Sequence, residues 1–288
     1  VMVQSIDGVG TKMIVARMMN NFNSIGMDLL SAAANDILVM GAKPITLLDY
    51  IATEKLKPEF IEQIVSGMSK ACQETGVSLV GGEIAEMPDT YLKGEYDLVG
   101  IITGIVEKNK IISGEKIKSG DKVLALPSSG LHTNGYSLAR KLIFEIEKLS
   151  INDTPKGMDQ SIGEILLEPH TNYTNQIQSI LDNDILPSGI AHITGGGLLE
   201  NIPRILPKDL NVFINKGSWP ILPIFNLLQS IGNISEQEMY RVFNMGVGMI
   251  LIVDDMQAKE VTNLLMNRTK IYEIGYIMDG ENKVLFNE

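Results

Sequence analysis

Short runs of β-branched and apolar residues alternate along the chain with longer runs in which apolar positions recur every three or four residues. The first pattern is typical of strands and the second of amphipathic helices. In the first 108 residues it predicts strands at 1–6, 45–53, 77–82 and 96–107, and helices at Ser24–Met40 and Pro58–Thr75. Such alternation indicates an α/β or α+β fold.

A second series of similar rhythm follows residues 108–120, a polar, lysine-rich and glycine-punctuated stretch with the composition of a linker. The series predicts strands at 121–129, 189–194, 210–215, 246–253 and 273–278, and helices at 135–148, 162–167, 173–181, 197–205, 222–231, 236–242 and 257–266. We therefore expect two domains, one over residues 1–108 and one over residues 121–288.

Composition narrows the class of protein. Of the 288 residues 44% are apolar and 20% charged, which is typical of a folded protein with a sizeable core. The net charge of −11 makes nucleic acid and membrane surfaces poor partners. The lone cysteine, Cys72, excludes an internal disulfide and fits a reducing compartment, so we expect a cytoplasmic protein. Because Val1 opens inside a strand-like run, we also expect that a preceding segment has been trimmed.

The first candidate site is Ser5–Lys12, where a predicted strand ends in a carboxylate, two glycines, a hydroxyl and an ammonium. Glycines let backbone amides approach an oxyanion, Lys12 supplies positive charge, and Asp7 at a strand end can hold Mg²⁺. The spacing is not that of a Walker A loop. An Asp-Gly turn followed by a surface lysine is the alternative, and these residues alone leave both open.

Polar residues also mark one side of the predicted helix over residues 25–41. At about 100° per residue, Asp28, Ser31 and Asn35 share a narrow arc, and Asp36 lies about 100° further round. A solvated face is one explanation, but such faces usually carry Lys and Glu. Since buried carboxylates are costly unless they are paired or metal-bound, we favour a metal or ligand role.

The segment Leu79–Met87 runs from a buried-type strand through Gly81 and Gly82 into Glu83 and Glu86. If the chain coils after the glycines, the two carboxylates share a face; a helix start with acids near its positive end is the alternative. Together with Asp7 and Asp36, Glu83 would complete an oxygen cluster suited to Mg²⁺.

Two further loops combine glycines with histidines beside predicted strands. Residues 127–135 offer hydroxyls, glycines and His132, a combination that is typical of an anion site with a proton donor. A plain Ser/Gly loop is the alternative. A serine hydrolase is disfavoured, because the segment lacks the G-x-S-x-G turn that such an enzyme needs. Residues 191–202 place His192 before a triple glycine and a helix, which suits a phosphate or simply a tight turn. His170 follows Pro169, and we expect it at the surface without a role.

The motifs together identify a family resemblance. They are DGVGTK at Asp7–Lys12, ANDI at Ala34–Ile37, LVGGEIAEMP at Leu79–Pro88, SSGLHTNGYSL at Ser128–Leu138, AHITGGGLLENIPR at Ala191–Arg204 and MYRVFNMGVGM at Met239–Met249. In this order and spacing the chain resembles the phosphoribosylformylglycinamidine cyclo-ligases, also called aminoimidazole ribonucleotide synthetases. The resemblance covers the whole chain, with small departures at Thr133 and Ile84.

The resemblance implies an ATP-dependent step of purine biosynthesis, in which formylglycinamidine ribonucleotide gives aminoimidazole ribonucleotide, ADP and phosphate. It implies Mg²⁺, with K⁺ as a further ion, and two α/β domains, each a sheet backed by helices. It also implies a homodimer whose N-terminal sheet is completed across the interface, and a glycine-rich ATP-associated segment before Val1.

The resemblance assigns roles to individual residues. The catalytic set is His132, Asp36 and Lys12, and the metal set is Asp7, Asp36 and Glu83. The ATP-binding set is Asp7, Gly8, Gly10, Thr11, Lys12, Asn35, Gly81, Gly82 and Glu83. The substrate-binding set is Ser128, Ser129, Gly130, Asn134, His192, Thr194, Gly195, Gly196 and Gly197.

Two alternatives stay open from the sequence. One is a sibling enzyme of the same superfamily, such as selenophosphate synthetase, thiamine-monophosphate kinase or the amidotransferase-coupled enzyme one step earlier. The other is a catalytically silent protein that keeps the nucleotide site.

Overall fold

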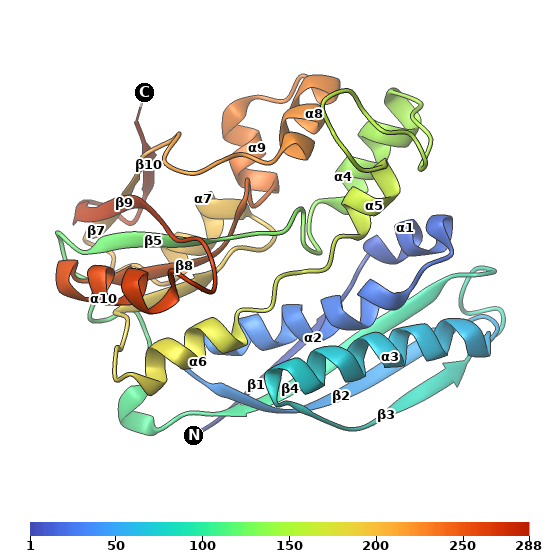
Figure 1. Ribbon diagram of the computed structural model, residues 1–288, viewed down its shortest axis with the longest axis horizontal. Coiled ribbons are helices and arrows are strands. Elements are labelled where there is room, and N and C mark those ends of the chain that lie inside the picture. The colour runs from blue at the N-terminus through green and yellow to red at the C-terminus, as the bar shows by residue number, and fades with distance from the viewer. Residues whose placement is uncertain (288) are drawn as a thin grey trace.

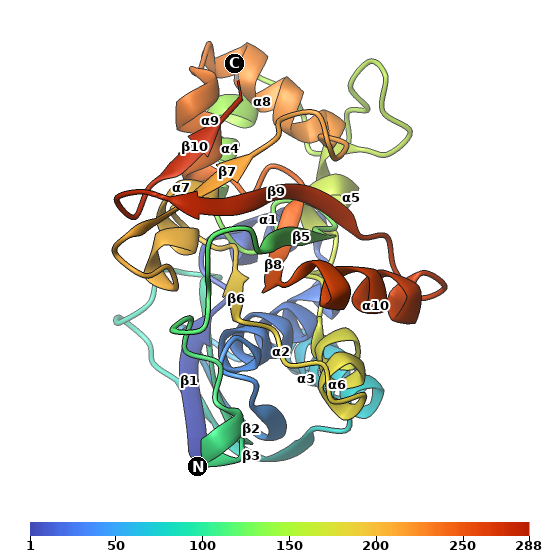
Figure 2. The same cartoon turned by 90° about the vertical axis from the view of Figure 1, so that its left-hand side faces the viewer.

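Two β-sheets with helices packed against them make up the computed structural model, which describes residues 1–287 (Figure 1). In two perpendicular views, helices α2 (Asn23–Leu38) and α6 (Thr174–Asp182) lie between the sheets (Figures 1 and 2). Among residues 1–287 no helix is long and apolar enough to cross a membrane. The molecule therefore has alternating layers of sheet and helix, and α2 is buried between the two sheets.

The first sheet has the strand order β1-β4-β2-β3. Its strands are β1 (Met2–Gly8), β2 (Lys43–Thr53), β3 (Ser78–Glu86) and β4 (Tyr96–Ile105). Strands β2 and β3 run parallel, while β4 is antiparallel to both β1 and β2. One face is covered by α2 and by α3 (Pro58–Thr75), and α1 (Lys12–Met19) follows β1.

Glycines allow α2 and α3 to approach closely. A Cβ atom at Gly26 would lie 2.0 Å from the carbonyl oxygen of Ile64, and one at Gly67 would lie 2.2 Å from the carbonyl oxygen of Asn23. Any side chain at either position would push the helices apart, so the two glycines fix the distance between the helices over the sheet.

The opposite face of the first sheet carries apolar side chains and no covering element of the described chain. Exposed apolar residues on it are Met2, Ile6, Leu48, Val80, Ile101 and Ile105. These residues alternate with inward-facing ones along their strands, as a period of two requires. An apolar surface of this kind is unusual for a monomer.

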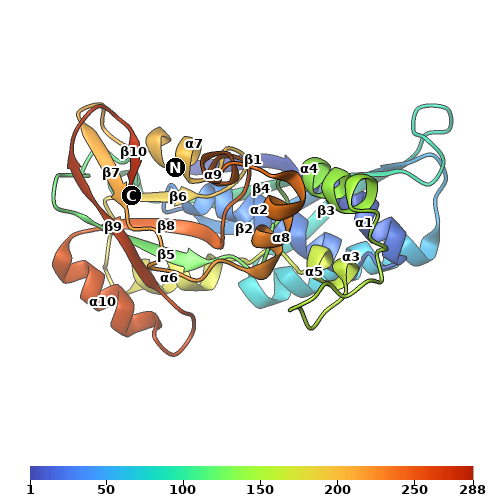
Figure 3. The same ribbon diagram turned by 90° about the horizontal axis from the view of Figure 1, so that it is seen from above.

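The second sheet has the order β10-β7-β9-β5-β8-β6. Its strands are β5 (Lys122–Pro127), β6 (Gly189–His192), β7 (Leu210–Ile214), β8 (Val247–Val253), β9 (Tyr272–Asp279) and β10 (Val284–Phe286). Every residue of β8 is buried, because this strand lies inside the sheet with both faces covered. Figure 3 shows this sheet at one end of the molecule and α1 and α3 at the other.

The helices of the second half cover that sheet and reach across to the first. They are α4 (Tyr136–Arg140), continued by a π-helical turn at Lys141–Ile146, α5 (Ile162–Leu167), α7 (Gly197–Asn201), α8 (Pro223–Gly232), α9 (Glu236–Val242) and α10 (Asp255–Leu265). Short 3-10 turns lie at Lys108–Lys110 and Ile202–Arg204. Helix α5 packs on α1, and α6 packs on both α2 and β2, so the two halves are interlocked.

The two-sheet α/β architecture and the predicted order of strands and helices are confirmed. Both alternatives for Leu79–Met87 are wrong: the chain neither coils nor starts a helix after Gly81 and Gly82, because β3 continues in register beside β2 as far as Glu86. In a strand, residues three apart point to opposite faces, so Glu83 and Glu86 do not share one. The pattern also fails to predict α1 and β10, which have only eight and three residues and are too short to show a clear period.

Candidate active site

Predicted site residues from both halves of the chain meet where α2 packs against the second half. The carboxyl end of α2 contributes Asn35 and Asp36, and β1 contributes Asp7. From the second half come His192 at the end of β6 and His132 in the loop before α4. The contacts among these side chains define the candidate active site.

Two carboxylates lie close together on the inner face of β1. The hydroxyl of Ser5 donates a hydrogen bond to Oδ2 of Asp36 at 3.1 Å, and Asp7 occupies the same face of the strand two residues further on. Burial raises the pKa of Asp7. A 2.7 Å hydrogen bond from the Gly8 amide lowers this pKa, and the nearby charge of Asp36 raises it. The pair offers the hard oxygen ligands that Mg²⁺ prefers.

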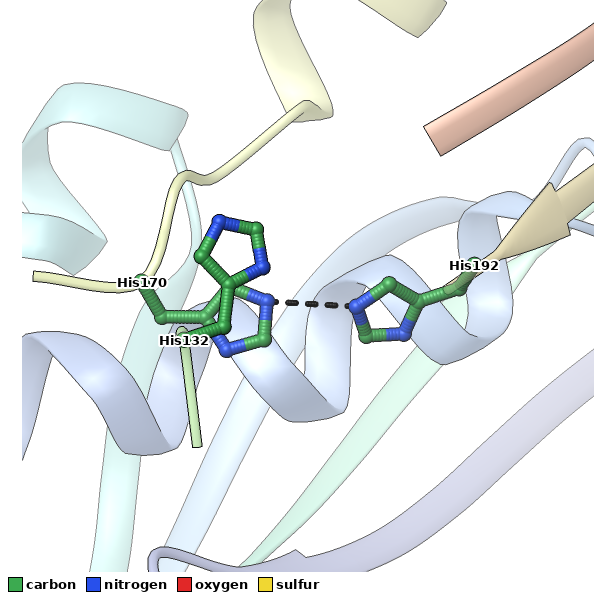
Figure 4. Close-up of side chains that lie close together, drawn as sticks. All are labelled: His132, His170 and His192. Atoms are coloured by element: carbon green, nitrogen blue, oxygen red, sulfur yellow. Dashed lines mark hydrogen bonds between the residues drawn. The ribbon is translucent and has the colours of Figure 1, made fainter. Parts of the chain in front are cut away.

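A chain of side-chain hydrogen bonds runs from Asp36 into the second half. Oδ1 of Asp36 lies 2.9 Å from Nδ1 of His192, whose Nε2 lies 3.1 Å from Nε2 of His170. Figure 4 shows the contact between His170 and His192. The other ring nitrogen of His170, Nδ1, lies 3.3 Å from the Thr133 hydroxyl. The Asp36 side chain is 33% exposed, whereas His170 and His192 are buried. Asp36 is therefore the solvent-facing end of an otherwise buried polar chain.

His132 lies against this chain. Its ring stacks on His170 with 3.9 Å between ring centroids and 19° between planes. It adopts a left-handed backbone conformation (φ 60°), which is uncommon for a non-glycine residue and is often found at functional sites. Burial lowers the pKa of His132 well below its ordinary value, and the nearby charges of His192 and Lys12 act in the same direction. His132 is therefore neutral near pH 7.

Internal hydrogen bonds hold the loop that carries His132. Ser128 donates to Oδ1 of Asn244 at 2.9 Å, and Asn244 donates to the carbonyl of Gly130 at 2.8 Å. The Ser129 hydroxyl donates to the carbonyl of Pro169 at 2.5 Å. Both serine hydroxyls predicted to bind substrate are thus engaged in fixing the loop.

The triple glycine adjoins the same loop. A Cβ atom at Gly195 would lie 3.4 Å from Oδ1 of Asn134, so the two predicted substrate-binding loops are neighbours. Asn201 donates to the carbonyls of Gly195 and Gly197 at 3.2 and 2.8 Å, and Thr194 donates to Oδ1 of Asn201 at 3.2 Å. Gly197 has φ 54°, and a Cβ atom there would lie 2.1 Å from the carbonyl oxygen of Tyr240.

Lys12 is neither a surface lysine nor turned toward Asp7 and Asp36. Its ammonium is fully buried and lies 2.8 Å from a carboxylate oxygen of Asp28, and it donates to the carbonyl of Glu168 at 2.6 Å. Burial lowers the pKa of Lys12 and raises the pKa of Asp28 to about 6, since each charge loses its water. Asp28, one of the polar residues along α2, therefore forms an internal ion pair with Lys12.

Of the other predicted ATP-binding residues, Asn35 is internal and the turn at Gly8–Thr11 is near the surface. The Asn35 amide donates to the carbonyl of Thr171 at 2.9 Å and accepts from the Tyr173 amide at 3.0 Å, so it holds the segment that carries His170. In the turn, Gly10 has φ 61° and Thr11 is exposed.

Glu83 does not join the other two predicted metal ligands within one chain. The pairing register connects Asp7 to Gly100, Gly100 to Asp49 and Asp49 to Gly82, which puts Glu83 three strands away from Asp7. With about 4.8 Å between neighbouring strands, the separation is about 14 Å. Gly81 and Gly82 lie on the same distant strand.

His170 is the residue that the sequence interpretation missed, and the expectation of a surface position is wrong. It is 2% exposed, and its backbone amide donates to Oδ1 of Asp28 at 2.7 Å. Among residues 1–287, the only group of three or more His, Cys, Asp or Glu side chains placed to hold a metal is His132, His170 and His192. Nothing in the local sequence distinguishes His170; only the small number of histidines could have drawn attention to it.

Two family models match almost the entire chain. The N-terminal domain of AIR synthase related proteins matches residues 1–106, and the C-terminal domain matches residues 118–287. Phosphoribosylformylglycinamidine cyclo-ligase from Geobacillus thermodenitrificans is 47% identical over 97% of this chain and 81% of its own length. The proteins of that name from Thermoanaerobacter pseudethanolicus and Brevibacillus brevis are 46% and 44% identical, over 99% and 100% of this chain and 84% and 83% of their own lengths.

Solved structures with the same fold are more distant in sequence. Thiamine-monophosphate kinase from Stenotrophomonas maltophilia superposes with a TM-score of 0.74 at 17% identity, covering 100% of this chain and 85% of that one. The hydrogenase maturation protein HypE in complex with ATP gives 0.72 at 16% identity, covering 99% and 81%. At this identity the likeness concerns the fold alone.

Proposed function

Because this chain belongs to the phosphoribosylformylglycinamidine cyclo-ligases of the AIR synthase related family, we infer that it closes the imidazole ring of aminoimidazole ribonucleotide. It converts formylglycinamidine ribonucleotide and ATP to that product, ADP and phosphate. The observation that carries the residue assignments is the meeting of Asp36, His192 and His132 from opposite halves of the chain in one site.

The reaction needs the formyl oxygen to become a leaving group. In the proposed sequence this oxygen attacks the γ-phosphorus of ATP and ADP departs, which leaves an imidoyl phosphate. The amidine-side nitrogen then attacks the same carbon, and phosphate leaves with the former formyl oxygen. Phosphoryl transfer requires little covalent work from the protein, so positioning and charge neutralisation supply most of the rate.

His132 is the proposed catalytic histidine. Its low pKa keeps the ring neutral near pH 7, so it acts on the transferred oxygen as a hydrogen-bond donor with one protonated nitrogen. Its Nε2 lies 3.3 Å from the Ser129 amide and can accept from it, which leaves Nδ1 to carry the proton. The buried Nδ1 has no partner in the described chain, so it is free to donate.

We propose that Mg²⁺ is held by Asp7 and Asp36, supported by the Ser5 hydroxyl that orients Asp36. The ion, when bound, neutralises phosphate charge on ATP. Glu83 is too far from Asp7 to share this ion within one chain. A role for K⁺ stays a prediction, and so does ATP binding by Gly8, Gly10 and Thr11. ATP binding and catalysis by Lys12 also stay predictions, but its buried ion pair with Asp28 supports a structural role.

We propose that the substrate's ribose phosphate binds where the loop at Asn134 adjoins the triple glycine at 195–197. The side-chain amide of Asn134 and the backbone amides of the glycines can donate hydrogen bonds to an anion there. The serine hydroxyls of the loop hold its shape and are not proposed as direct ligands.

We also propose a homodimer formed through the uncovered face of the first sheet. Its exposed apolar side chains lie on all four strands, and burying them against a second copy would remove them from water. Sedimentation at micromolar concentration is expected to show a dimer, and a single species near 31.6 kDa would refute it.

The buried free thiol of Cys72 fits the proposed cytoplasmic location.

Release of ADP measured separately with formylglycinamidine ribonucleotide, thiamine monophosphate and selenide tests the function directly. We expect rapid release only with the ribonucleotide, accompanied by one aminoimidazole ribonucleotide per ADP. Faster release with either of the other substrates, or ADP without ring closure, would overturn the proposal.

A further inference from the structure

All three histidines of the chain lie in one buried cluster. His132 comes from the loop before α4, His170 from the segment after α5 and His192 from the end of β6. One nitrogen from each ring lies within 4.8 Å of the other two, and the residues are 1%, 2% and 6% exposed. The proposed cyclisation uses His132 but gives no reason for two further imidazoles beside it.

We propose that His132, His170 and His192 form a binding site for a borderline divalent transition-metal ion, with Zn²⁺ as its representative. Imidazole nitrogen suits zinc, cobalt and nickel, whereas Mg²⁺ takes oxygen ligands. This site is therefore distinct in chemistry from the proposed carboxylate site at Asp7 and Asp36.

The separations suit such an ion. With Zn–N distances of about 2.05 Å, two ligands of a tetrahedral site lie about 3.3 Å apart. Nε2 of His170 and Nε2 of His192 are 3.1 Å apart, so a small outward movement of either ring admits an ion between them. Figure 4 shows the three rings gathered with nitrogens facing the space between His170 and His192.

His132 supplies the third nitrogen. Its Nδ1 is buried and makes no hydrogen bond in the described chain, an arrangement that is costly for a polar atom without a ligand. The His132 ring lies parallel to His170, so it must tilt out of the stack for its nitrogen to point at a shared ion. Metal binding therefore replaces the stacking contact with coordination.

The surroundings favour metal-binding imidazoles. Burial lowers the pKa values of His132 and His170 well below their ordinary value, and the neutral ring is the form that ligates. The Asp36 carboxylate faces Nδ1 of His192 and the Thr133 hydroxyl faces Nδ1 of His170. Partners of this kind orient histidine ligands and increase their basicity in zinc sites. Three protein ligands leave a fourth position for water or an anion.

The test is equilibrium dialysis of tag-free full chain against Zn²⁺ in excess Mg²⁺, without nucleotide or substrate. We expect one zinc per chain in the wild type and at least tenfold weaker binding in His170→Gln, which keeps a polar side chain of similar length. Cys72→Ser, which removes the only thiol, and Asp7→Asn, which alters the carboxylate site, should bind zinc like the wild type. Circular dichroism verifies that each variant is folded.

X-ray absorption at the zinc edge of the wild-type protein provides a second measurement that needs no variant. We expect scattering from three imidazole rings. Less than stoichiometric binding by the wild type, unchanged affinity in His170→Gln, or a zinc shell made only of oxygen would overturn the proposal. Zinc bound at Nδ1 of His132 would replace the proton that this nitrogen donates in the proposed cyclisation, so one chain cannot use His132 in both ways at once. Because no step of the binding test involves turnover, failure of the zinc site leaves the proposed cyclo-ligase function untouched, and failure of that function leaves the zinc site untouched.

Discussion

Helix α2 carries two aspartates eight residues apart, and they lie in opposite environments. Asp28 is fully buried, pairs with the Lys12 ammonium and accepts the backbone amide of His170. The Asp36 side chain is 33% exposed, accepts from Ser5 and faces His192. The first aspartate has all its neighbours inside the protein, while the second keeps one side open to solvent.

This difference shows that residue type and helix position do not by themselves identify a functional carboxylate. Asp28 accepts from Lys12 of α1 and from the backbone amide of His170, and Lys12 also donates to the carbonyl of Glu168, so the ion pair joins the two halves of the chain. Asp36 has partners that fix its orientation but leave it accessible to a ligand. We therefore assign Asp28 to stability and Asp36 to chemistry.

The largest expected effect is on stability at the Asp28 end. Asp28→Asn leaves the Lys12 ammonium buried without a counter-charge, which should lower the free energy of unfolding by about 3–5 kcal/mol. Urea denaturation measures this directly. The double variant Lys12→Met/Asp28→Leu, which removes both charges, should recover most of the loss. A loss below 1 kcal/mol in Asp28→Asn would contradict the structural assignment.

Replacing His132 is expected to have a slightly smaller effect, and this effect is on kcat. If His132 acts on the oxygen in flight, its interaction is stronger in the transition state than with bound substrate. His132→Ala should then lower kcat by about 100-fold, the lower end of proton-transfer contributions, with KM for the ribonucleotide within a few-fold. Steady-state kinetics on the purified variant test this. A packing role would instead raise KM and lower stability while leaving kcat unchanged.

The variant Asp7→Asn tests whether Asp7 and Asp36 form a magnesium site. Asp7→Asn should reduce Mg²⁺-dependent turnover by at least about tenfold, because a neutral amide does not replace a carboxylate on the ion. Titration of activity with Mg²⁺ gives the answer. Wild-type kinetics at saturating Mg²⁺ would remove Asp7 from the metal site.

The smallest expected effect concerns acid stability. His132 and His170 have pKa values lowered by burial, so the unfolded chain binds more protons and stability is lost as the pH falls below about 6.5. Asp28, whose pKa is raised to about 6, works in the opposite direction below that pH. The net loss should be about 1 kcal/mol per pH unit, from two histidines against one aspartate. His170→Gln should reduce that slope toward zero in urea denaturation at pH 5–6; an unchanged slope would contradict it.

Much of the fold follows from local pattern. The helix at Pro58–Thr75 is predicted to the residue, because a proline at its first position and a glycine after its last delimit a clear amphipathic repeat. The failure at β3 has a physical reason. Two successive glycines usually end a strand, but here pairing with β2 supplies the backbone hydrogen bonds that keep the chain extended.

The site was less predictable because its contacts are long-range. Asp7, His132 and His192 could be proposed from motifs beside predicted strand ends, and Asp36 from the polar side of a predicted helix. The roles of Lys12 and Asp28 could not, since their pairing depends on how α1 packs against α2 and on the carbonyl of Glu168, 156 residues away. His170 is buried by contacts with α2 and β6 that no local pattern records.

The most direct test of the division along α2 is to measure kcat/KM for Asp36→Asn and Asp28→Asn side by side, at a temperature where circular dichroism shows both fully folded. We predict at least about a tenfold loss in Asp36→Asn, equivalent to 1.4 kcal/mol of transition-state stabilisation, and a loss below about threefold in Asp28→Asn. Equal losses in the two variants, or the larger loss in Asp28→Asn, would contradict the assignment of chemistry to Asp36 and stability to Asp28.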